Sequence, residues 1–240
     1  MTEFDRSNWA KKEFTQLYRD NADIYIVERK RMFDLMKSFY THFHGNREKT
    51  KVLDLGCGDG VITGELLTVD NNISATLVDA SGDMLAKAKE RLGGRRNITF
   101  IKASFQEMHG KDMPGEDYDF IISSLAIHHL SMTEKRAMFK LIYAHLNEGG
   151  HFMNIDVVRA ADDTIDQWYM QIWEEWMDKK KSMLGKKGEP SREIIDRYKE
   201  ADENKPDTLE DQLSAMKEIG FGIVDCYYKY GIFTMYGGKK

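Results

Sequence analysis

Two hydrophobic periods alternate along the middle of the chain. Between residues 51 and 158, short runs rich in β-branched and aromatic residues are separated by stretches whose apolar positions recur every three to four residues. This alternation is typical of a parallel sheet with helices on both faces. The expected strands are Lys51–Leu55, Ser74–Asp79, Ile98–Ala103, Tyr118–Ser124 and His151–Val157.

Capping residues mark the ends of the intervening helices. Ser81 precedes one amphipathic stretch, which Gly93-Gly94 can end in left-handed geometry. Ser131 begins another, and Glu134 follows three residues later, which is the spacing of a capping box. We expect this second helix to end at Gly149-Gly150.

The regions on either side of this core have their own patterns. The first 48 residues are mostly helical in period, a charged segment with three of the four tryptophans follows the core, and the C-terminal residues return to strand chemistry. That last part predicts an antiparallel hairpin at the sheet edge. The 240 residues are expected to form one domain with a helical cap (1–48), a core (49–158), a helical insert or lid (159–212) and a C-terminal strand hairpin (213–240).

Composition narrows the class of partner. The chain has 35 Lys and Arg against 40 Asp and Glu, a formal charge of −5, so it has no overall attraction to nucleic acid or to an anionic membrane. The longest apolar run, Phe120–Leu130, is interrupted by polar residues and is too short for a membrane span. Two cysteines, Cys57 and Cys226, cannot build a disulfide framework, which favours a reducing, cytoplasmic location.

A glycine-rich turn carries the clearest chemical signal. Gly56, Gly58 and Gly60 directly follow the apolar strand Lys51–Leu55, and a helical pattern begins after them. Such a turn brings bare backbone N–H groups and a helix N-terminus to a nucleotide-like ligand. A dinucleotide fingerprint would need glycine where Val61 stands, so NAD and FAD are disfavoured. Tight turns require glycine even without a ligand, so the turn alone leaves a purely structural reading open.

A carboxylate on the next strand supports a cofactor. Asp79 ends the second strand about 20 residues past the glycines, where an acid can accept hydrogen bonds from both ribose hydroxyls. With this arrangement, and over Val52–Asp79, Ile121–Leu130 and Gly149–Asp156, the chain resembles the class I S-adenosylmethionine-dependent methyltransferases, above all the small ones that act on metabolites. The resemblance implies a Rossmann-like, seven-stranded, mostly parallel sheet with a reversed hairpin at one edge. It also implies methyl transfer from S-adenosylmethionine to a small-molecule acceptor, leaving S-adenosylhomocysteine.

The resemblance also assigns cofactor contacts residue by residue. It implies that the methionine end is held by Asp54, Gly56, Cys57 and Gly58, the ribose by Asp79 and the adenine by Ala80, Met84, Ser104 and Phe105, while Ser124 and Leu125 line the sulfonium region. Ser104 departs from the family, in which an acidic residue commonly accepts from the adenine amino group. Either its hydroxyl replaces that contact or the contact is lost.

Aromatic residues outside the core have two readings. Tyr18 and Tyr25 are similar to an aromatic pair that many relatives fold over the cofactor, with Arg29 placed for its carboxylate. Alternatively, they bury one face of an amphipathic helix and Arg29 is solvated. Four aromatic residues of the insert either roof a substrate pocket or form the insert's own core: Trp168, Tyr169, Trp173 and Trp176.

His128 is the candidate catalytic residue. The resemblance places the first histidine after the fourth strand at the reaction centre, and an imidazole suits proton removal from a hydroxyl, amine or thiol. The alternative is a loop histidine that caps backbone groups. His129 is expected to be structural. Asp156 either faces the cleft or is a solvated carboxylate at a strand end.

Two other functions remain open. A nucleic-acid methyltransferase is disfavoured because residues 123–126 lack the Asp/Asn-Pro-Pro-aromatic turn of base-directed enzymes. A non-methylating user of the cofactor, such as a carboxy-S-adenosylmethionine synthase, would have the same cradle. Methyl transfer from a sulfonium is an in-line displacement, for which we expect no metal. The acceptor atom and the oligomeric state are left undetermined.

Overall fold

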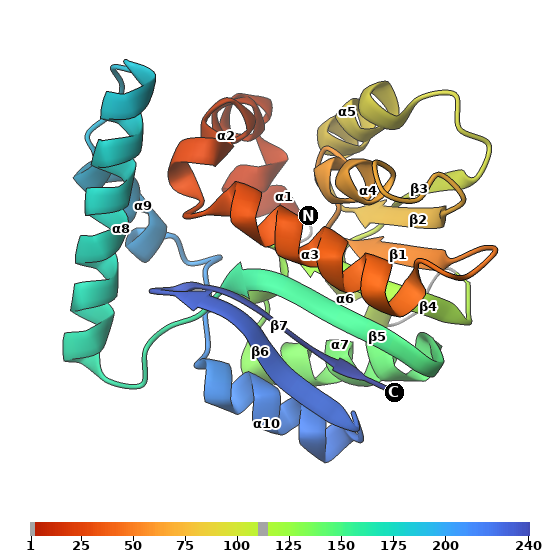
Figure 1. Ribbon diagram of the computed structural model, residues 1–240. Coiled ribbons are helices and arrows are strands. Elements are labelled where there is room, and N and C mark those ends of the chain that lie inside the picture. The colour runs from red at the N-terminus through yellow and green to blue at the C-terminus, as the bar shows by residue number, and fades with distance from the viewer. Residues whose placement is uncertain (1–2, 110–114) are drawn as a thin grey trace.

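Seven strands form one sheet in the computed structural model, which describes residues 3–109 and 115–240. Their order is β3-β2-β1-β4-β5-β7-β6, parallel from β3 to β5, with β7 antiparallel to both of its neighbours (Figure 1). This confirms the predicted fold class and the C-terminal hairpin. The strands are β1 (Lys51–Leu55), β2 (Ser74–Asp79), β3 (Ile98–Lys102), β4 (Tyr118–Ser124), β5 (Leu146–Val157), β6 (Ile223–Tyr230) and β7 (Phe233–Lys239).

One predicted helix end is wrong. Helix α7 (Met132–His145) stops well before Gly149-Gly150, because Leu146 already pairs with Tyr118 and begins β5. The glycines therefore lie inside the strand. The other capping predictions are confirmed: Ser81 accepts from the N–H of Met84 at 3.3 Å, and Ser131 and Glu134 form the capping box.

Helices cover both faces of the sheet (Figure 1). One face carries α3 (Arg29–His44), α4 (Val61–Leu66) and α5 (Gly82–Leu92), and the other carries α6 (Phe105–His109), α7 and α10 (Leu209–Ile219). Successive residues of a strand pack on opposite faces of the sheet: in β4, Phe120 and Ile122 belong to the core cluster of one face, and Ile121 to that of the other. A sheet buried on both faces places its exposed chemistry at the strand ends.

The first part of the predicted cap, up to Tyr25, and the insert helices lie beyond the carboxyl ends of the parallel strands, whereas the rest of that cap, α3, packs on the sheet (Figure 1). The elements beyond the strand ends are α1 (Glu3–Arg6), η1 (Asn8–Ala10), α2 (Lys12–Tyr25), α8 (Asp163–Leu184) and α9 (Ser191–Glu200). Trp173 Nε1 donates to the carbonyl of Tyr25 at 2.8 Å, which joins α8 to α2. The two ends of the insert lie side by side on the core. The backbone N–H of Arg159 donates to the carbonyl of Asp207 at 3.2 Å, and Arg159 forms an isolated β-bridge with Thr208. Within the described residues, no helix combines the length and apolar character needed to cross a membrane.

Candidate active site

The glycine turn joins the ends of β1 and β2. Gly56 and Gly58 have positive φ, +66° and +54°, and a Cβ on Gly56 would lie 2.4 Å from that of Ala126. A Cβ on Gly58 would meet nothing within 4 Å, so the backbone there borders open space. The carboxylate of Asp79 accepts from the N–H of Gly58 at 2.8 Å and from that of Ser81 at 2.7 Å. Burial raises the pKa of Asp79, and these two hydrogen bonds oppose that shift. The carboxylate retains lone pairs for further donors.

Three adjoining cavities lie between the turn, the cap and the insert. We name them after one residue each. The Asp79 cavity measures about 170 Å³, the Arg29 cavity about 190 Å³ and the His128 cavity about 130 Å³. Tyr18 and Leu125 border all three, so they mark the point at which the cavities meet.

Leu125 is held in an unusual backbone conformation at this junction. Its φ is +52°, a left-handed value that costs free energy for a residue with a branched side chain. The N–H of Leu125 donates to the carbonyl of Ile155 at 2.7 Å, which fixes the end of β4 against β5. The loop after β4 therefore turns sharply around the junction of the cavities.

Most of the predicted cofactor residues converge on two of these cavities. The Asp79 cavity is lined by Tyr18, Gly56, Gly58, Asp79, Ala80, Met84, Ser104, Phe105, Ser124 and Leu125, and the Arg29 cavity adds Arg29 and Cys57. Tyr25 borders only the His128 cavity. Asp54 borders none of the three.

Asp54 is instead fully buried beneath the turn. Its Oδ2 accepts from the hydroxyl of Thr63 at 2.7 Å, while Oδ1 has no hydrogen-bond partner in the described part of the chain. Desolvation raises the pKa of Asp54 to about 7, although the hydrogen bonds from Thr63 oppose the shift. A buried acid without a full set of donors is more stable protonated.

We expect this raised pKa to appear in the pH dependence of folding. The folded protein keeps a proton on Asp54 between its unfolded pKa of 3.8 and about 7, so the contribution to stability is complete below that range and is lost as pH rises through it. Between pH 5 and 8 the loss is about 3 kcal/mol. Asp54→Asn should remove this part of the slope in urea unfolding. An unchanged slope would contradict the raised pKa.

Two predicted cofactor residues already have partners. Ser104 caps α6, since its N–H and its hydroxyl both bond to the carboxylate of Glu107, at 2.8 and 3.1 Å. Its hydroxyl hydrogen is therefore committed to the cap, and the suggested adenine contact stays a prediction without support from this geometry. Arg29 pairs with the exposed Asp23 at 2.7 Å while its guanidinium lies over the ring of Phe33.

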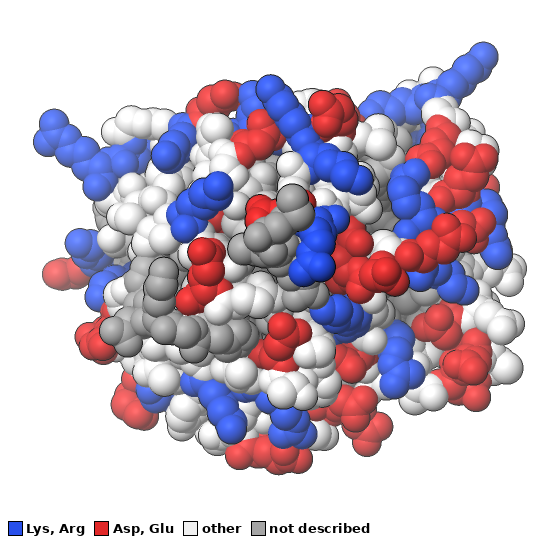
Figure 2. Space-filling model, turned by 180° about the vertical axis from the view of Figure 1, so that it is seen from behind, with Lys and Arg blue, Asp and Glu red and all other residues white. Residues whose placement is uncertain are grey.

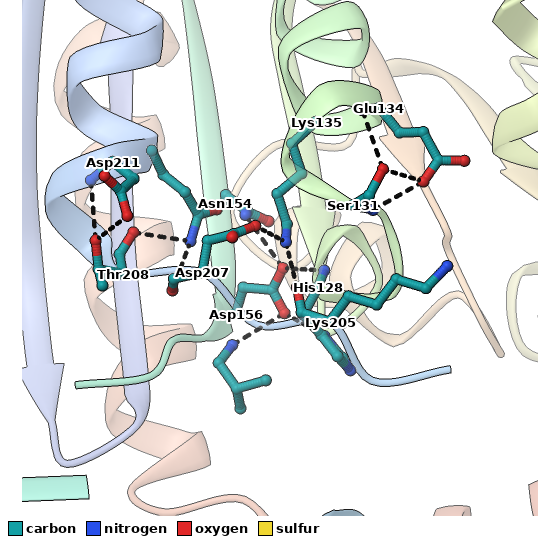
Figure 3. A network of polar contacts seen from close by, with 12 residues as sticks. His128, Ser131, Glu134, Lys135, Asn154, Asp156, Lys205, Asp207, Thr208 and Asp211 are labelled. Atoms are coloured by element: carbon teal, nitrogen blue, oxygen red, sulfur yellow. Dashed lines mark hydrogen bonds and ion pairs between the residues drawn. The ribbon is translucent and has the colours of Figure 1, made fainter. Parts of the chain in front are cut away.

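A buried carboxylate orients His128. The Nδ1 of His128 lies 2.6 Å from Oδ1 of Asp156, and its backbone N–H donates to Oδ2 at 2.9 Å (Figure 3). Asn154 and the N–H of Val157 donate to the same carboxylate, at 3.3 and 2.9 Å. Because Nδ1 carries the hydrogen toward the carboxylate, Nε2 of the neutral ring has a free lone pair. No described residue hydrogen-bonds that Nε2, and His128 borders the cavity named after it.

Asp156 therefore differs from both readings of the sequence. It is 1% exposed and borders none of the three cavities, so it is neither a solvated carboxylate nor a wall of the cleft. The reason is geometric: η2 (Ile127–His129) folds over the end of β5 and covers the carboxylate with His128.

The insert is tied to the same loop. Lys205 donates its backbone N–H to the carbonyl of His128 at 2.9 Å, and the fully buried Lys135 pairs with Asp207 at 2.6 Å (Figure 3). His129 Nδ1 lies 3.0 Å from the carbonyl of Glu203, so it does hold structure as predicted, although its ring also borders the Asp79 cavity. The returning end of the insert is thus fixed against the loop that carries both histidines.

Several residues that border the cavities were not predicted from the sequence. Trp9 and Glu203 border both the Asp79 and the His128 cavities, and Phe14 and Tyr198 line the latter. Of the insert aromatics, Trp173 lines the His128 cavity whereas Trp168 is 53% exposed. Among these residues, only Trp9, which is far from the other tryptophans in the sequence, could have been singled out as a candidate cavity residue.

Known proteins are similar to this chain around the glycine turn. Residues 52–150 match the sequence family described as a methyltransferase domain, over the same strand, turn and helix units that bring Asp79 to the glycine turn. Residues 52–150 thus match a methyltransferase domain, and the chain has the fold of solved S-adenosylmethionine-dependent methyltransferases. The cofactor of this family is S-adenosylmethionine.

The relatives differ in how much of this chain and of their own length the match covers. A malonyl-[acyl-carrier protein] O-methyltransferase of Ilyobacter polytropus is 29% identical over 143 residues, 58% of this chain and 50% of that protein. The match to relatives of this kind thus spans about half of their length. A carboxy-S-adenosyl-L-methionine synthase of Nautilia profundicola is 24% identical over 91% of this chain and 84% of its own. The magnesium protoporphyrin IX methyltransferase of Synechocystis, solved with S-adenosylhomocysteine, has the same fold, with a TM-score of 0.65 at 13% identity over 97% of this chain and 96% of that one.

The residues present fit this cofactor. Open space lies over Gly58, and the carboxylate of Asp79 has acceptor capacity left at the cavity wall. An adenosyl group, which carries ribose hydroxyl donors, needs both.

Proposed function

We propose that the chain transfers a methyl group from S-adenosylmethionine to a small-molecule acceptor in the His128 cavity. The observation that carries the proposal is the shared border at Tyr18 and Leu125, where two cavities lined by the predicted cofactor residues adjoin a third that holds a histidine. In this assignment Asp79 holds the ribose, Ala80 and Met84 pack on the adenine, and Arg29 receives the carboxylate.

The cofactor supplies an electrophilic methyl when it is bound, and the protein's part is positioning. Tyr18 and Leu125 hold the acceptor in line with the methyl group, which is the main requirement of a displacement reaction. The His128 cavity is lined mostly by aromatic and aliphatic side chains and excludes water from the reacting atoms. His128 Nε2 accepts a proton from an acceptor that arrives protonated, and Asp156 keeps the ring in the tautomer this requires.

The surface supports a small acceptor over a nucleic acid. Acidic and basic side chains are interspersed over the described residues of the face in Figure 2, without a broad area of one sign. Two lysines at the end of α8 and just after it are engaged within the protein: Lys181 bonds to Ser191 at 2.8 Å and Lys186 to the carbonyl of Asp20 at 3.1 Å. Nucleic-acid binding relies on clustered free cations.

The second candidate is a non-methylating reaction on the cofactor itself. Its support is the carboxy-S-adenosyl-L-methionine synthase relative, which matches 91% of this chain, against 58% for the malonyl-[acyl-carrier protein] O-methyltransferase. The cavities described above do not distinguish the two reactions, because both begin with the same cofactor.

One labelling experiment separates them. The protein is first titrated with S-adenosylmethionine by calorimetry, and then incubated with the methyl-labelled cofactor and a small-molecule extract. We expect saturable binding and a labelled small-molecule product with release of S-adenosylhomocysteine. A heavier sulfonium nucleoside in place of that product would favour the second candidate, and absence of binding would contradict both.

A further inference from the structure

The wall between the Asp79 and His128 cavities carries a carboxylate without a cation. Glu203 borders both cavities. Its Oε1 accepts from the backbone N–H and the side-chain amide of Asn8, at 3.2 and 3.0 Å. Across residues 3–109 and 115–240, Oε2 of Glu203 has no hydrogen-bond partner and the carboxylate forms no ion pair. The neutral amide of Asn8 therefore positions this charge without neutralising it.

The cationic side chains nearby are engaged elsewhere. Arg197, which lines the His128 cavity, bonds through both terminal nitrogens to the carboxylate of Glu189. The side chain of Lys205 extends toward Glu134, whose pKa its charge helps to lower (Figure 3). His129 donates to the backbone of Glu203, but burial holds the pKa of His129 well below its usual value, so the ring stays neutral. The cavity wall keeps a net negative charge.

Aromatic rings surround the same space. Those of the His128 cavity are Trp9, Phe14, Tyr18, Tyr25, Trp173, Tyr198 and Phe233. Trp9 and Tyr18 lie edge to face with ring centroids 4.9 Å apart, at the boundary that Glu203 shares. Aromatic faces attract cations, and tryptophan does so most strongly. A carboxylate together with aromatic faces is a site for an organic cation rather than for a neutral alcohol.

We propose that the methyl acceptor is an amine, which the His128 cavity binds as an ammonium ion between Glu203 and the rings of Trp9 and Tyr18. The inference rests on the proposed function and names its substrate class. It also gives His128 a defined task, because an ammonium nitrogen has no lone pair until one proton has left it.

The transfer step balances without any further reactant. One N–H bond of the ammonium breaks and its proton passes to Nε2 of His128, which leaves the electron pair on nitrogen. That pair forms the new N–C bond to the methyl carbon, while the C–S bond breaks and its pair stays on sulfur. The products are a methylated ammonium and a neutral thioether, and the imidazolium returns its proton to solvent. The positive charge of the sulfonium is thus transferred to the product.

Matched probes test the charge preference. The protein saturated with S-adenosylhomocysteine is titrated by calorimetry at neutral pH with phenethylamine and, separately, with 2-phenylethanol, which has the same shape without the charge. We expect the amine to bind about tenfold more tightly than the alcohol, as one charge-assisted hydrogen bond with cation–π contact implies. The preference should disappear in Glu203→Gln, which keeps an oxygen for Asn8.

Glu200→Gln is the matched control, because Glu200 ends α9 on the surface and borders none of the three cavities. It should keep the tenfold preference. Equal binding of the two probes, a preference that survives in Glu203→Gln, or no binding of either probe would each overturn the inference. Methyl transfer to hydroxyl compounds alone would also overturn it while leaving the proposed function intact. Failure of S-adenosylhomocysteine to bind would instead contradict the proposed function.

Discussion

Asp79→Ala is expected to weaken the binding of S-adenosylmethionine by about a hundredfold, because the proposed ribose contact would lose two charge-assisted hydrogen bonds. The same change removes the acceptor of the Gly58 and Ser81 N–H groups, so the turn keeps only the hydrogen bonds of Gly56 and Cys57 to the carbonyl of Val78 in β2. Both effects act on cofactor affinity. Calorimetric titration with S-adenosylmethionine and with S-adenosylhomocysteine measures the loss.

Controls separate affinity from folding in this experiment. Glu90→Ala removes an exposed carboxylate from α5 and should leave the dissociation constant unchanged. Thermal unfolding of Asp79→Ala without ligand should remain cooperative, since the variant also removes a buried charge whose pKa burial has raised. A dissociation constant equal to that of the parent protein would show that the ribose is held elsewhere.

His128→Gln is expected to lower kcat by roughly a hundredfold to ten-thousandfold, the usual contribution of a general base. Glutamine has similar size and can still donate to Asp156, but it has no nitrogen that accepts a proton near neutral pH. Cofactor affinity should change little, because His128 borders the His128 cavity and neither of the two cavities proposed for the cofactor. Turnover is measured with the acceptor that the labelling experiment identifies.

Two further variants sharpen this test. Asp156→Asn should lower kcat in the same direction, because the amide no longer favours a hydrogen on Nδ1. His145→Gln changes a histidine at the far end of α7 that bonds to the carbonyl of Leu141, and should leave turnover unchanged. If His128→Gln turned over at the parent rate, the histidine would be a loop cap, as the alternative reading held.

The cofactor side of the site was predictable because its signals are local. Strand, turn and helix follow one another around Gly56 and Gly58, and the next strand supplies Asp79 at a fixed topological position. The positive φ of Leu125 was not predictable, since no glycine marks it. The strand start at Leu146 was also missed, because it depends on pairing with Tyr118 rather than on the local glycines.

The acceptor side was not predictable because it is assembled from distant segments. Trp9 and Glu203 lie 194 residues apart yet border the same two cavities. Glu203 sits in a charged stretch whose composition resembles any solvated surface, and only the tertiary fold places it against Asn8 and His129. The pairing of His128 with Asp156 likewise depends on how the loop after β4 folds over β5.

The adjacent anchor points of the insert, Arg159 and Thr208, have an evolutionary consequence. A segment that starts and stops at neighbouring positions can be exchanged for one of different length without changing the order of the strands. Selection can therefore remodel one wall of the His128 cavity, the proposed acceptor site, as an interchangeable module while the glycine turn and Asp79 are inherited unchanged. Proteins that share this cradle and differ between these two anchors would differ in the compounds they modify.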